Sequence, residues 1–197
     1  MPEELTRVVV IYGFLGSGKT TLMLHLAKRI TASGKRAAIV VNEAGKVPVD
    51  GKLLTAAGLP VREIFAGCIC CSVVGDFIET LGALVGSSEF SRVFVEPSGM
   101  ADAPRLFESL HRHGGFPLWK ILVLDGVRLP LLMKAARPLM EGQIREADII
   151  LLNKEDAIDG DDKDSLIGLI EKSVHHAPVY PVSVLSGIPD GLMNELL

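Results

Sequence analysis

The sequence predicts an α/β fold, in which a mostly parallel central sheet is flanked by helices on both faces as a three-layer sandwich. Short runs rich in branched apolar residues recur along the chain without polar alternation, which is typical of parallel strands buried on both faces. Segments with the apolar spacing of helices lie between these runs. Strands that alternate with helices favour a parallel sheet over an antiparallel one.

The predicted elements follow one another in regular alternation. Strands are predicted at 8–13, 37–42, 92–96, 120–125, 148–153 and 178–184. Helices are predicted at roughly 18–33, 72–86, 102–113, 128–147, 162–175 and 190–197. A short acidic loop is predicted at 157–164. Because no repeat, low-complexity tract or Pro/Gly linker divides the chain, residues 1–197 are expected to form a single domain.

Composition excludes several classes of protein. A hydrophobic content of 48% with 22% charged residues is typical of a globular chain and not of a disordered one. A formal net charge of -4 provides no basic patch for nucleic acid or an anionic membrane. No segment approaches the ~20 apolar residues of a membrane span, and the acidic N-terminus lacks the cationic region of a signal peptide. We therefore expect a cytoplasmic protein with reduced thiols, no nucleic-acid partner and no membrane contact.

The stretch "GFLGSGKTT" at 13–21 fits G-x-x-x-x-G-K-[ST] and stands between a predicted strand and a predicted helix, as a P-loop requires. Its glycines let backbone N–H groups point at a β-phosphate, next to the positive end of the helix. We expect Lys19 to reach the β- and γ-phosphates and the Thr20 hydroxyl to bind Mg²⁺. The alternative is a chance glycine turn, which the flanking elements disfavour. The motif also predicts the fold of a P-loop NTPase. The predicted nucleotide-binding residues here are Gly13, Gly16, Ser17, Gly18, Lys19, Thr20 and Thr21.

A second motif, N-K-x-D, follows the apolar strand in "LLNKED" and comprises Asn153, Lys154 and Asp156. A carboxylate in the plane of the base accepts hydrogen bonds from both the ring N–H and the exocyclic amine of guanine, whereas adenine offers no such pair of donors. The alternative is a polar turn that caps the strand. After a P-loop, and at the carboxyl end of a parallel strand, the motif favours GTP and GDP as ligands. The turn "SVLSG" at 183–187, which begins with Ser183, is predicted to add backbone contacts to the base; the alternative is an ordinary turn rich in Ser and Gly.

All the cysteines of the chain lie in "GCICC": Cys68, Cys70 and Cys71. Three reduced thiols in C-x-C-C form a soft-donor cluster that suits Zn²⁺ and also accepts Co²⁺ or Ni²⁺. A disulfide between the neighbours Cys70 and Cys71 would be strained. The alternative is a packing or redox role. Three thiolates leave a fourth position open, which fits a site that must release its metal.

Five motifs in order carry a resemblance to the nucleotide-binding domain of the CobW family of P-loop GTPases, relatives of the nickel-insertion GTPases for urease and hydrogenase. Beside the P-loop, they are "VNEAGKVPVDGKLL" at 41–54, "GCICC" at 67–71, "VEPSGMAD" at 95–102 and "QIREADIILLNKED" at 143–156. The resemblance implies that the second block is a switch I loop that ends at Asp50. It also implies that "GCICC" is a metal motif and that "EPSG" is an acidic counterpart of the usual D-x-x-G.

Further residues are predicted to act at the triphosphate and at Mg²⁺. Glu96 ends a buried strand, so we expect its carboxylate to emerge beside the P-loop and hold a water on Mg²⁺; the alternative is an N-cap-like acid at the next helix. Gly99 is expected to turn a backbone N–H toward the γ-phosphate. By resemblance, Asp50 orients the attacking water or the metal. The predicted catalytic residues are Lys19, Asp50 and Glu96, and the predicted Mg²⁺ ligands are Thr20, Asp50 and Glu96.

The resemblance implies a GTPase with slow intrinsic turnover that binds Zn²⁺ or Co²⁺ at C-x-C-C and couples hydrolysis to metal delivery to a client protein. It also implies a homodimer that forms around nucleotide. One alternative is a GTP-dependent chaperone that gates loading of a cofactor such as a corrinoid, with structural cysteines. A small-molecule phosphotransferase is a third, but the chain lacks an Arg-rich lid segment.

Two features depart from the family pattern. Lys46 stands where relatives commonly carry a glutamate, which removes an oxygen ligand, and Ala103 is inserted after the acidic motif. The histidine pairs 111/113 and 175/176 lie on predicted helix ends and are expected to be solvated.

Overall fold

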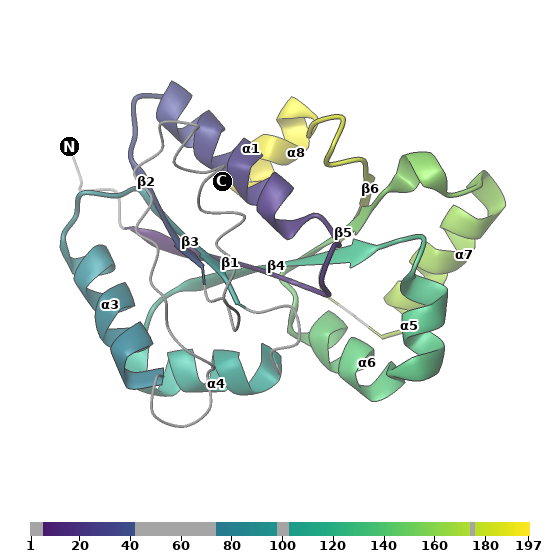
Figure 1. Cartoon of the computed structure of the whole chain (residues 1–197), viewed down its shortest axis with the longest axis horizontal. Helices are drawn as coiled ribbons and strands as arrows, with labels where there is room; N and C mark the ends of the chain where they lie inside the picture. Colours follow the sequence, from purple (N-terminus) through teal and green to yellow (C-terminus); the bar gives the residue numbers. More distant parts are fainter. Residues whose placement is uncertain (1–5, 42–73, 98–102, 174–175) are drawn as a thin grey trace.

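The computed structural model describes residues 6–41, 74–97, 103–173 and 176–197. These residues form a six-stranded sheet in the order β2-β3-β1-β4-β5-β6, and each neighbouring pair of strands is parallel (Figure 1). The strands are β1 (Arg7–Tyr12), β2 (Ala37–Val41), β3 (Arg92–Glu96), β4 (Leu118–Asp125), β5 (Ile149–Asn153) and β6 (Val179–Val182). The predicted parallel sheet is confirmed. Across the described ranges, no helix combines the length and apolar character needed to cross a membrane.

Helices cover both faces of the sheet, so the predicted three-layer sandwich is confirmed (Figure 1). One face carries α1 (Lys19–Ala32) and α8 (Asp190–Leu196). The other carries α3 (Val74–Gly86), α4 (Ala103–Gly114), α5 (Leu129–Ala135), α6 (Arg137–Glu146) and α7 (Gly160–Glu171).

Strand β1 lies in the middle of the sheet, with helices over both faces. This position explains why its apolar residues do not alternate with polar ones. Val8 and Val10 pack under α3 to α7, whereas Val9 and Ile11 pack under α1 and α8. All four side chains are fully buried. Burying each such side chain stabilises the fold by roughly 1.5–3 kcal/mol. The P-loop therefore begins from a rigid strand.

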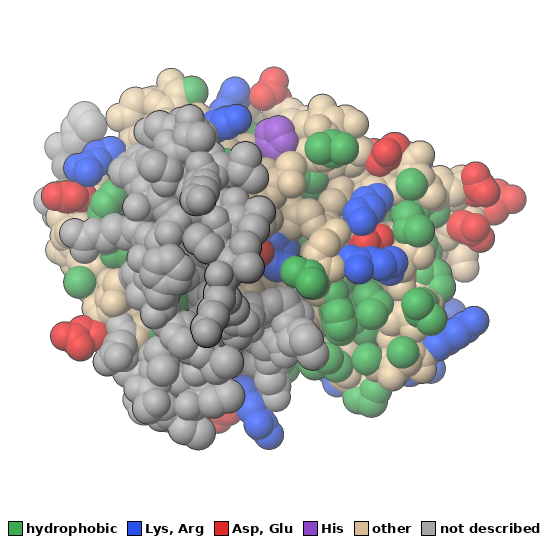
Figure 2. All heavy atoms as spheres, in the orientation of Figure 1, with side chains coloured by type: hydrophobic (Ala, Val, Ile, Leu, Met, Phe, Trp, Pro, Cys, Tyr) green, Lys and Arg blue, Asp and Glu red, His purple; other side chains and the backbone are tan. Residues whose placement is uncertain are grey.

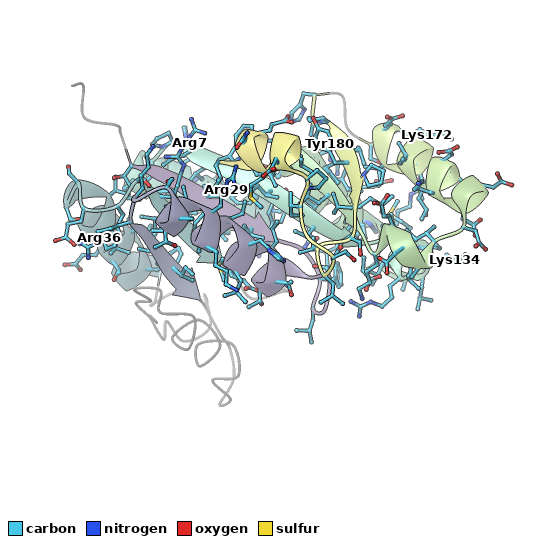
Figure 3. The ribbon with its side chains drawn as sticks, turned by 90° about the horizontal axis from the view of Figure 1, so that it is seen from above. Arg7, Arg29, Arg36, Lys134, Lys172 and Tyr180 are labelled. Carbon is cyan, nitrogen blue, oxygen red and sulfur yellow. The ribbon has the colours of Figure 1, made fainter. Side chains whose placement is uncertain are left out.

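The short helix α8 makes polar contacts with α1 at its start and with β6 near its end. Arg29 of α1 lies 3.3 Å from the Asp190 carboxylate at the start of α8. The Tyr180 hydroxyl on β6 donates to Glu195 at 2.8 Å, and this hydrogen bond raises the pKa of Tyr180. Figure 3 shows Arg29 and Tyr180 beside α8. At the end of the chain, Arg92 Nε donates to the Leu197 carbonyl at 2.6 Å.

Two predicted boundaries are wrong. The helix expected at 128–147 is two helices, α5 and α6, separated at Ala136, which has φ −144°. Pro138 lacks a backbone N–H and is tolerated in the first turn of a helix, so a new helix begins at residue 137. The acidic loop expected at 157–164 is shorter, because α7 begins at Gly160. Asp161 and Asp162 occupy its first turn, where the positive helix end favours carboxylates.

The order of the strands creates a topological switch point next to β1, where the chain changes the direction in which it adds strands to the sheet. The chain passes from β1 to β2 and β3 on one side and then crosses to β4 and β5 on the other. Ligands of open α/β sheets bind at the carboxyl ends of the strands where this reversal occurs. The ends of β3, β4 and β5 carry Glu96, Asp125 and Asn153, and the P-loop follows the end of β1.

Candidate nucleotide-binding site

The loop between β1 and α1 has the backbone conformation that its glycines predicted. Gly13, Gly16 and Gly18 have φ of +136°, +75° and +105°, which L side chains rarely adopt. A Cβ on Gly13 would lie 2.2 Å from the Val123 carbonyl oxygen, and one on Gly18 would lie 2.3 Å from Asn153 Nδ2. The loop is therefore packed against β4 and β5, and it ends where α1 begins at Lys19.

Ser17 lies within this loop and is fully buried. Its backbone N–H donates to the Phe14 carbonyl at 3.2 Å. Within the described parts of the chain, its hydroxyl has no hydrogen-bond partner. Buried polar atoms are normally hydrogen-bonded, so an unpartnered hydroxyl inside a glycine-rich loop fits a loop built to hold a polar ligand.

Glu96 links the end of β3 to the start of α1. Its Oε1 lies 3.6 Å from Lys19 Nζ, and its Oε2 accepts a hydrogen bond from the Thr20 hydroxyl at 3.0 Å. Lys19 Nζ also donates to the Phe14 carbonyl at 3.1 Å. The side chains of Lys19 and Glu96 are only 4% and 12% exposed, so little water screens the ion pair.

The carboxylate of Glu96 contacts Lys19 and Thr20 beside the P-loop, whereas the segment at 98–102, on which its alternative role as a helix N-cap depends, lies outside the described residues. The prediction that Glu96 emerges beside the P-loop is confirmed. A carboxylate and a hydroxyl are both hard oxygen donors, the type that Mg²⁺ prefers. Glu96 and Thr20 therefore fit the chemistry of a Mg²⁺ site.

Asn153 ties three segments together. Its Nδ2 donates to the Ser17 carbonyl at 2.6 Å, and its Oδ1 accepts from the backbone N–H of Val184 at 2.9 Å. Asn153 is 4% exposed, so both hydrogen bonds are shielded from water. The end of β5 is thereby joined to the P-loop and to the loop that follows β6. The simpler interpretation of N-K-x-D as a turn that only caps its strand is not supported by these contacts.

The other two residues of the motif face the same edge. Lys154 has the left-handed φ of +67°, and its Nζ contacts Asp125 Oδ2 at 2.7 Å. Asp156 is exposed in a single turn of 3₁₀ helix, η1 (Glu155–Ala157), and accepts a hydrogen bond from the Ser183 hydroxyl. Ser183 thus holds the carboxylate of Asp156, a contact that the sequence did not predict.

Asp125 and Arg128 belong to the site but were missed in the sequence. Asp125 ends β4, is 2% exposed, and accepts hydrogen bonds from Lys154 and from Arg128 Nε, the latter at 2.6 Å. Burial by itself would raise the pKa of Asp125, but the hydrogen bonds from Lys154 and Arg128 outweigh it and hold the pKa below its ordinary value. An aspartate directly after the apolar run "KILVL" was the signal that would have found it.

Several predicted site residues lie outside the described parts of the chain: Asp50, Cys68, Cys70, Cys71 and Gly99. Thr21 lies half-buried in the first turn of α1. His111 and His176 are exposed, as expected.

The fold and the site define a P-loop nucleotide-binding domain. A family model described as CobW/HypB/UreG, nucleotide-binding domain, matches residues 7–181, and the chain belongs to this family. The resemblance found in the sequence is confirmed.

Among named relatives, the zinc chaperone YeiR of Escherichia coli is 34% identical over 157 residues, which cover 77% of this chain and 47% of YeiR. The zinc chaperone YjiA of the same organism is 31% identical over 187 residues, which cover 89% of this chain and 57% of YjiA. The chain thus spans about half the length of these relatives.

Solved structures share the fold. The hydrogenase maturation factor HypB of Archaeoglobus fulgidus superposes with a TM-score of 0.70 at 17% identity, covering 99% of this chain and 92% of that one. The nickel complex of HypB from Helicobacter pylori superposes with a TM-score of 0.64 at 17% identity, covering 98% and 85%.

Proposed function

We propose that the chain binds and hydrolyses GTP and couples hydrolysis to the delivery of Zn²⁺ or Co²⁺ to a client protein. The observation that carries the proposal is the hydrogen bond from Asn153 to Ser17, because it joins a guanine-recognition motif to a phosphate-binding loop. Relatives named zinc chaperones and a family of nucleotide-binding domains support the same assignment. The cytoplasm, where thiols stay reduced, is the proposed compartment.

Guanine is proposed to lie against Asn153 and Asp156, with the carboxylate of Asp156 accepting from two N–H donors of the base. Ser183 supports this role because its hydroxyl holds the carboxylate. Lys154 is proposed to line the base-binding side of the site. The phosphates are assigned to the backbone N–H groups of the loop at 13–18 and to Lys19.

Mg²⁺ would be held by Thr20 and Glu96, with Asp50 as a further ligand, and would neutralise charge on the β- and γ-phosphates. Lys19 would exchange its contact with Glu96 for the phosphates, and Glu96 would then be free to orient a water. Asp50 is proposed to orient the attacking water, and Gly99 to offer its N–H to the γ-phosphate. We expect slow intrinsic turnover, on the order of one per minute or less, because no arginine finger is evident in the sequence.

The delivered metal is assigned to Cys68, Cys70 and Cys71, whose thiolates suit a tetrahedral Zn²⁺ or Co²⁺ with one open position. Along the sequence this cluster lies between Asp50 and Glu96, two residues proposed to act at the triphosphate. We therefore expect nucleotide state and metal affinity to be coupled.

A homodimer around nucleotide is part of the proposal. Large hydrophobic side chains are exposed in loops that follow carboxyl ends of the strands: Leu15 (77%), Val127 (53%) and Leu185 (88%). In the view of Figure 2, hydrophobic side chains lie beside lysine and arginine side chains on the part of the surface that is coloured by residue type. Such a surface around a ligand site fits a protein partner. Sedimentation velocity with a non-hydrolysable GTP analogue, compared with GDP, tests whether the analogue doubles the mass.

The central experiment is an anaerobic titration with zinc and cobalt in the presence of a chromophoric chelator, run with the GTP analogue and with GDP. We expect one metal per chain and an affinity that differs between the two nucleotides and falls in Cys70→Ala. An affinity indifferent to nucleotide and to Cys70 would instead favour the chaperone that gates cofactor loading, with structural cysteines.

A further inference from the structure

Arg128 lies at the N-terminus of α5, in the turn that follows β4. Its backbone N–H donates to Asp125 Oδ1 at 3.2 Å, and its Nε donates to Asp125 Oδ2 at 2.6 Å. Its Nη2 donates to the backbone carbonyl of Leu15 in the P-loop. The buried Asp125 thus fixes the guanidinium at one side while the P-loop fixes it at the other.

The guanidinium rests directly on the tip of the P-loop. A Cβ on Gly16 would lie 3.1 Å from Arg128 Nη2, which is close packing against the flexible end of a long side chain. The same Asp125 Oδ2 that binds Arg128 Nε also binds Lys154 Nζ. Arg128 therefore lies between the phosphate-binding loop and the N-K-x-D motif.

The net positive charge of Arg128, Lys154 and Asp125 together favours binding of an anion beside the P-loop. Two cations, Arg128 and Lys154, share the single carboxylate of Asp125, so the three side chains retain an excess of positive charge. The Arg128 side chain is 45% exposed, and within the described residues no acceptor contacts its Nη1. The guanidinium thus has both a charge and N–H donors that contact no acceptor among the described residues, and such donors bind phosphate oxygens in charge-assisted hydrogen bonds.

We propose that Arg128 is a nucleotide-positioning residue that holds the P-loop tip at Leu15 and Gly16 and donates to the β-phosphate of a bound guanosine diphosphate or triphosphate. This inference rests on the proposed function, because it requires a guanine nucleotide to span the motif at 153–156 and the loop at 13–20. A purely structural brace between β4 and the P-loop would make the same contacts with the protein but would not interact with phosphate.

The test compares the wild-type chain with Arg128→Gln and Arg128→Lys. The matched control is Arg137→Gln, which removes an exposed arginine that contacts Glu141 one turn further along the same helix, α6. Affinities for GDP and GMP are measured by calorimetry, and thermal unfolding reports stability. The ¹H–¹⁵N resonance of Arg128 Nε is followed during addition of each nucleotide.

We expect Arg128→Gln to weaken GDP binding about tenfold or more, with a smaller effect on GMP and a partial recovery in Arg128→Lys. The Arg128 Nε resonance should shift with GDP, and Arg137→Gln should match wild type. If Arg128→Gln binds GDP as wild type does, or loses GDP and GMP equally together with stability, the inference is overturned while GTP binding stands. A wild-type chain that binds no guanine nucleotide overturns the proposed function as well.

Discussion

The side-chain amide of Asn153 donates to the backbone carbonyl of Ser17 at 2.6 Å and accepts from the backbone N–H of Val184 at 2.9 Å. One buried amide thus couples the P-loop at the end of β1 to the loop after β6. Because these loops come from distant parts of the sequence, the contact makes the shape of the P-loop depend on the position of the end of β5.

Replacing Asn153 with Ala should therefore reduce both stability and nucleotide affinity. The change leaves the Ser17 carbonyl and the Val184 N–H without their partner, and each unsatisfied buried group costs about 1–3 kcal/mol. Urea unfolding and GDP titration measure the two effects. Asn194→Ala, on the exposed side of α8, is the control and should change neither. Equal behaviour of the two variants would contradict the coupling.

Gly18→Ala should destabilise the chain more than Gly34→Ala does. Both glycines have positive φ, +105° and +79°, so both alanines carry backbone strain, roughly 1–2 kcal/mol. Among the described residues, the new Cβ at position 18 meets Asn153 Nδ2 at 2.3 Å, whereas the new Cβ at position 34 has no atom of these residues within 4 Å. The difference in unfolding free energy between the variants measures the close approach, and a difference near zero would contradict it.

How much of this site the sequence predicted depends on whether a residue's role is local. The glycine spacing and Lys19 were predicted because a P-loop is a continuous segment whose chemistry is encoded within nine residues. Glu96 was predicted beside the loop because parallel strands bring their carboxyl ends to one edge. Asp125 and Arg128 were missed because their partners, Lys154 and Leu15, are far away along the chain.

The fold shows the same division. The strands were predicted because buried parallel strands need continuous apolar runs, whereas the break between α5 and α6 was missed because apolar spacing continues across Ala136. Pro138 marks the start of the second helix, but a proline in the first turn of a helix and a proline that breaks one look alike without the neighbouring dihedral angles.

The stability of the chain should depend on pH through Asp125. Its folded-state pKa lies below the ordinary value of 3.8, so the ionised carboxylate contributes stability that is present above that value. That contribution is lost as the pH falls below 3.8 and through the folded-state pKa. The difference in unfolding free energy between wild type and Asp125→Asn should be constant near neutral pH and shrink in this acidic window. A difference that does not change with pH would contradict the role of the charge.

Glu96→Gln should separate binding from hydrolysis. Removing the carboxylate charge frees the buried Lys19 from its ion pair, so GDP affinity should be retained, whereas the proposed water-orienting acid is lost. Single-turnover phosphate release at saturating Mg²⁺ and GTP should slow by about tenfold or more. Glu89→Gln, which removes an exposed carboxylate beside Arg36, is the control. Hydrolysis at the wild-type rate in Glu96→Gln would remove Glu96 from the mechanism.

Asp156→Asn should change which base the site accepts. The carboxylate accepts from the ring N–H and the exocyclic amine of guanine, whereas an amide presents one acceptor and one donor and so suits xanthine, which carries an oxygen in place of that amine. We expect at least a tenfold loss of GDP affinity and a relative gain for xanthosine diphosphate, because hydrogen bonds to a charged group are worth about 1.5–3 kcal/mol.

Two controls separate this change from a loss of charge alone. Asp159→Asn removes an exposed carboxylate at the N-terminus of α7 and should leave both affinities unchanged. Ser183→Ala keeps the Asp156 carboxylate but removes the hydroxyl that holds it, so it should weaken GDP binding without improving xanthosine diphosphate. If Asp156→Asn loses both nucleotides equally, Asp156 supports the loop and does not contact the base.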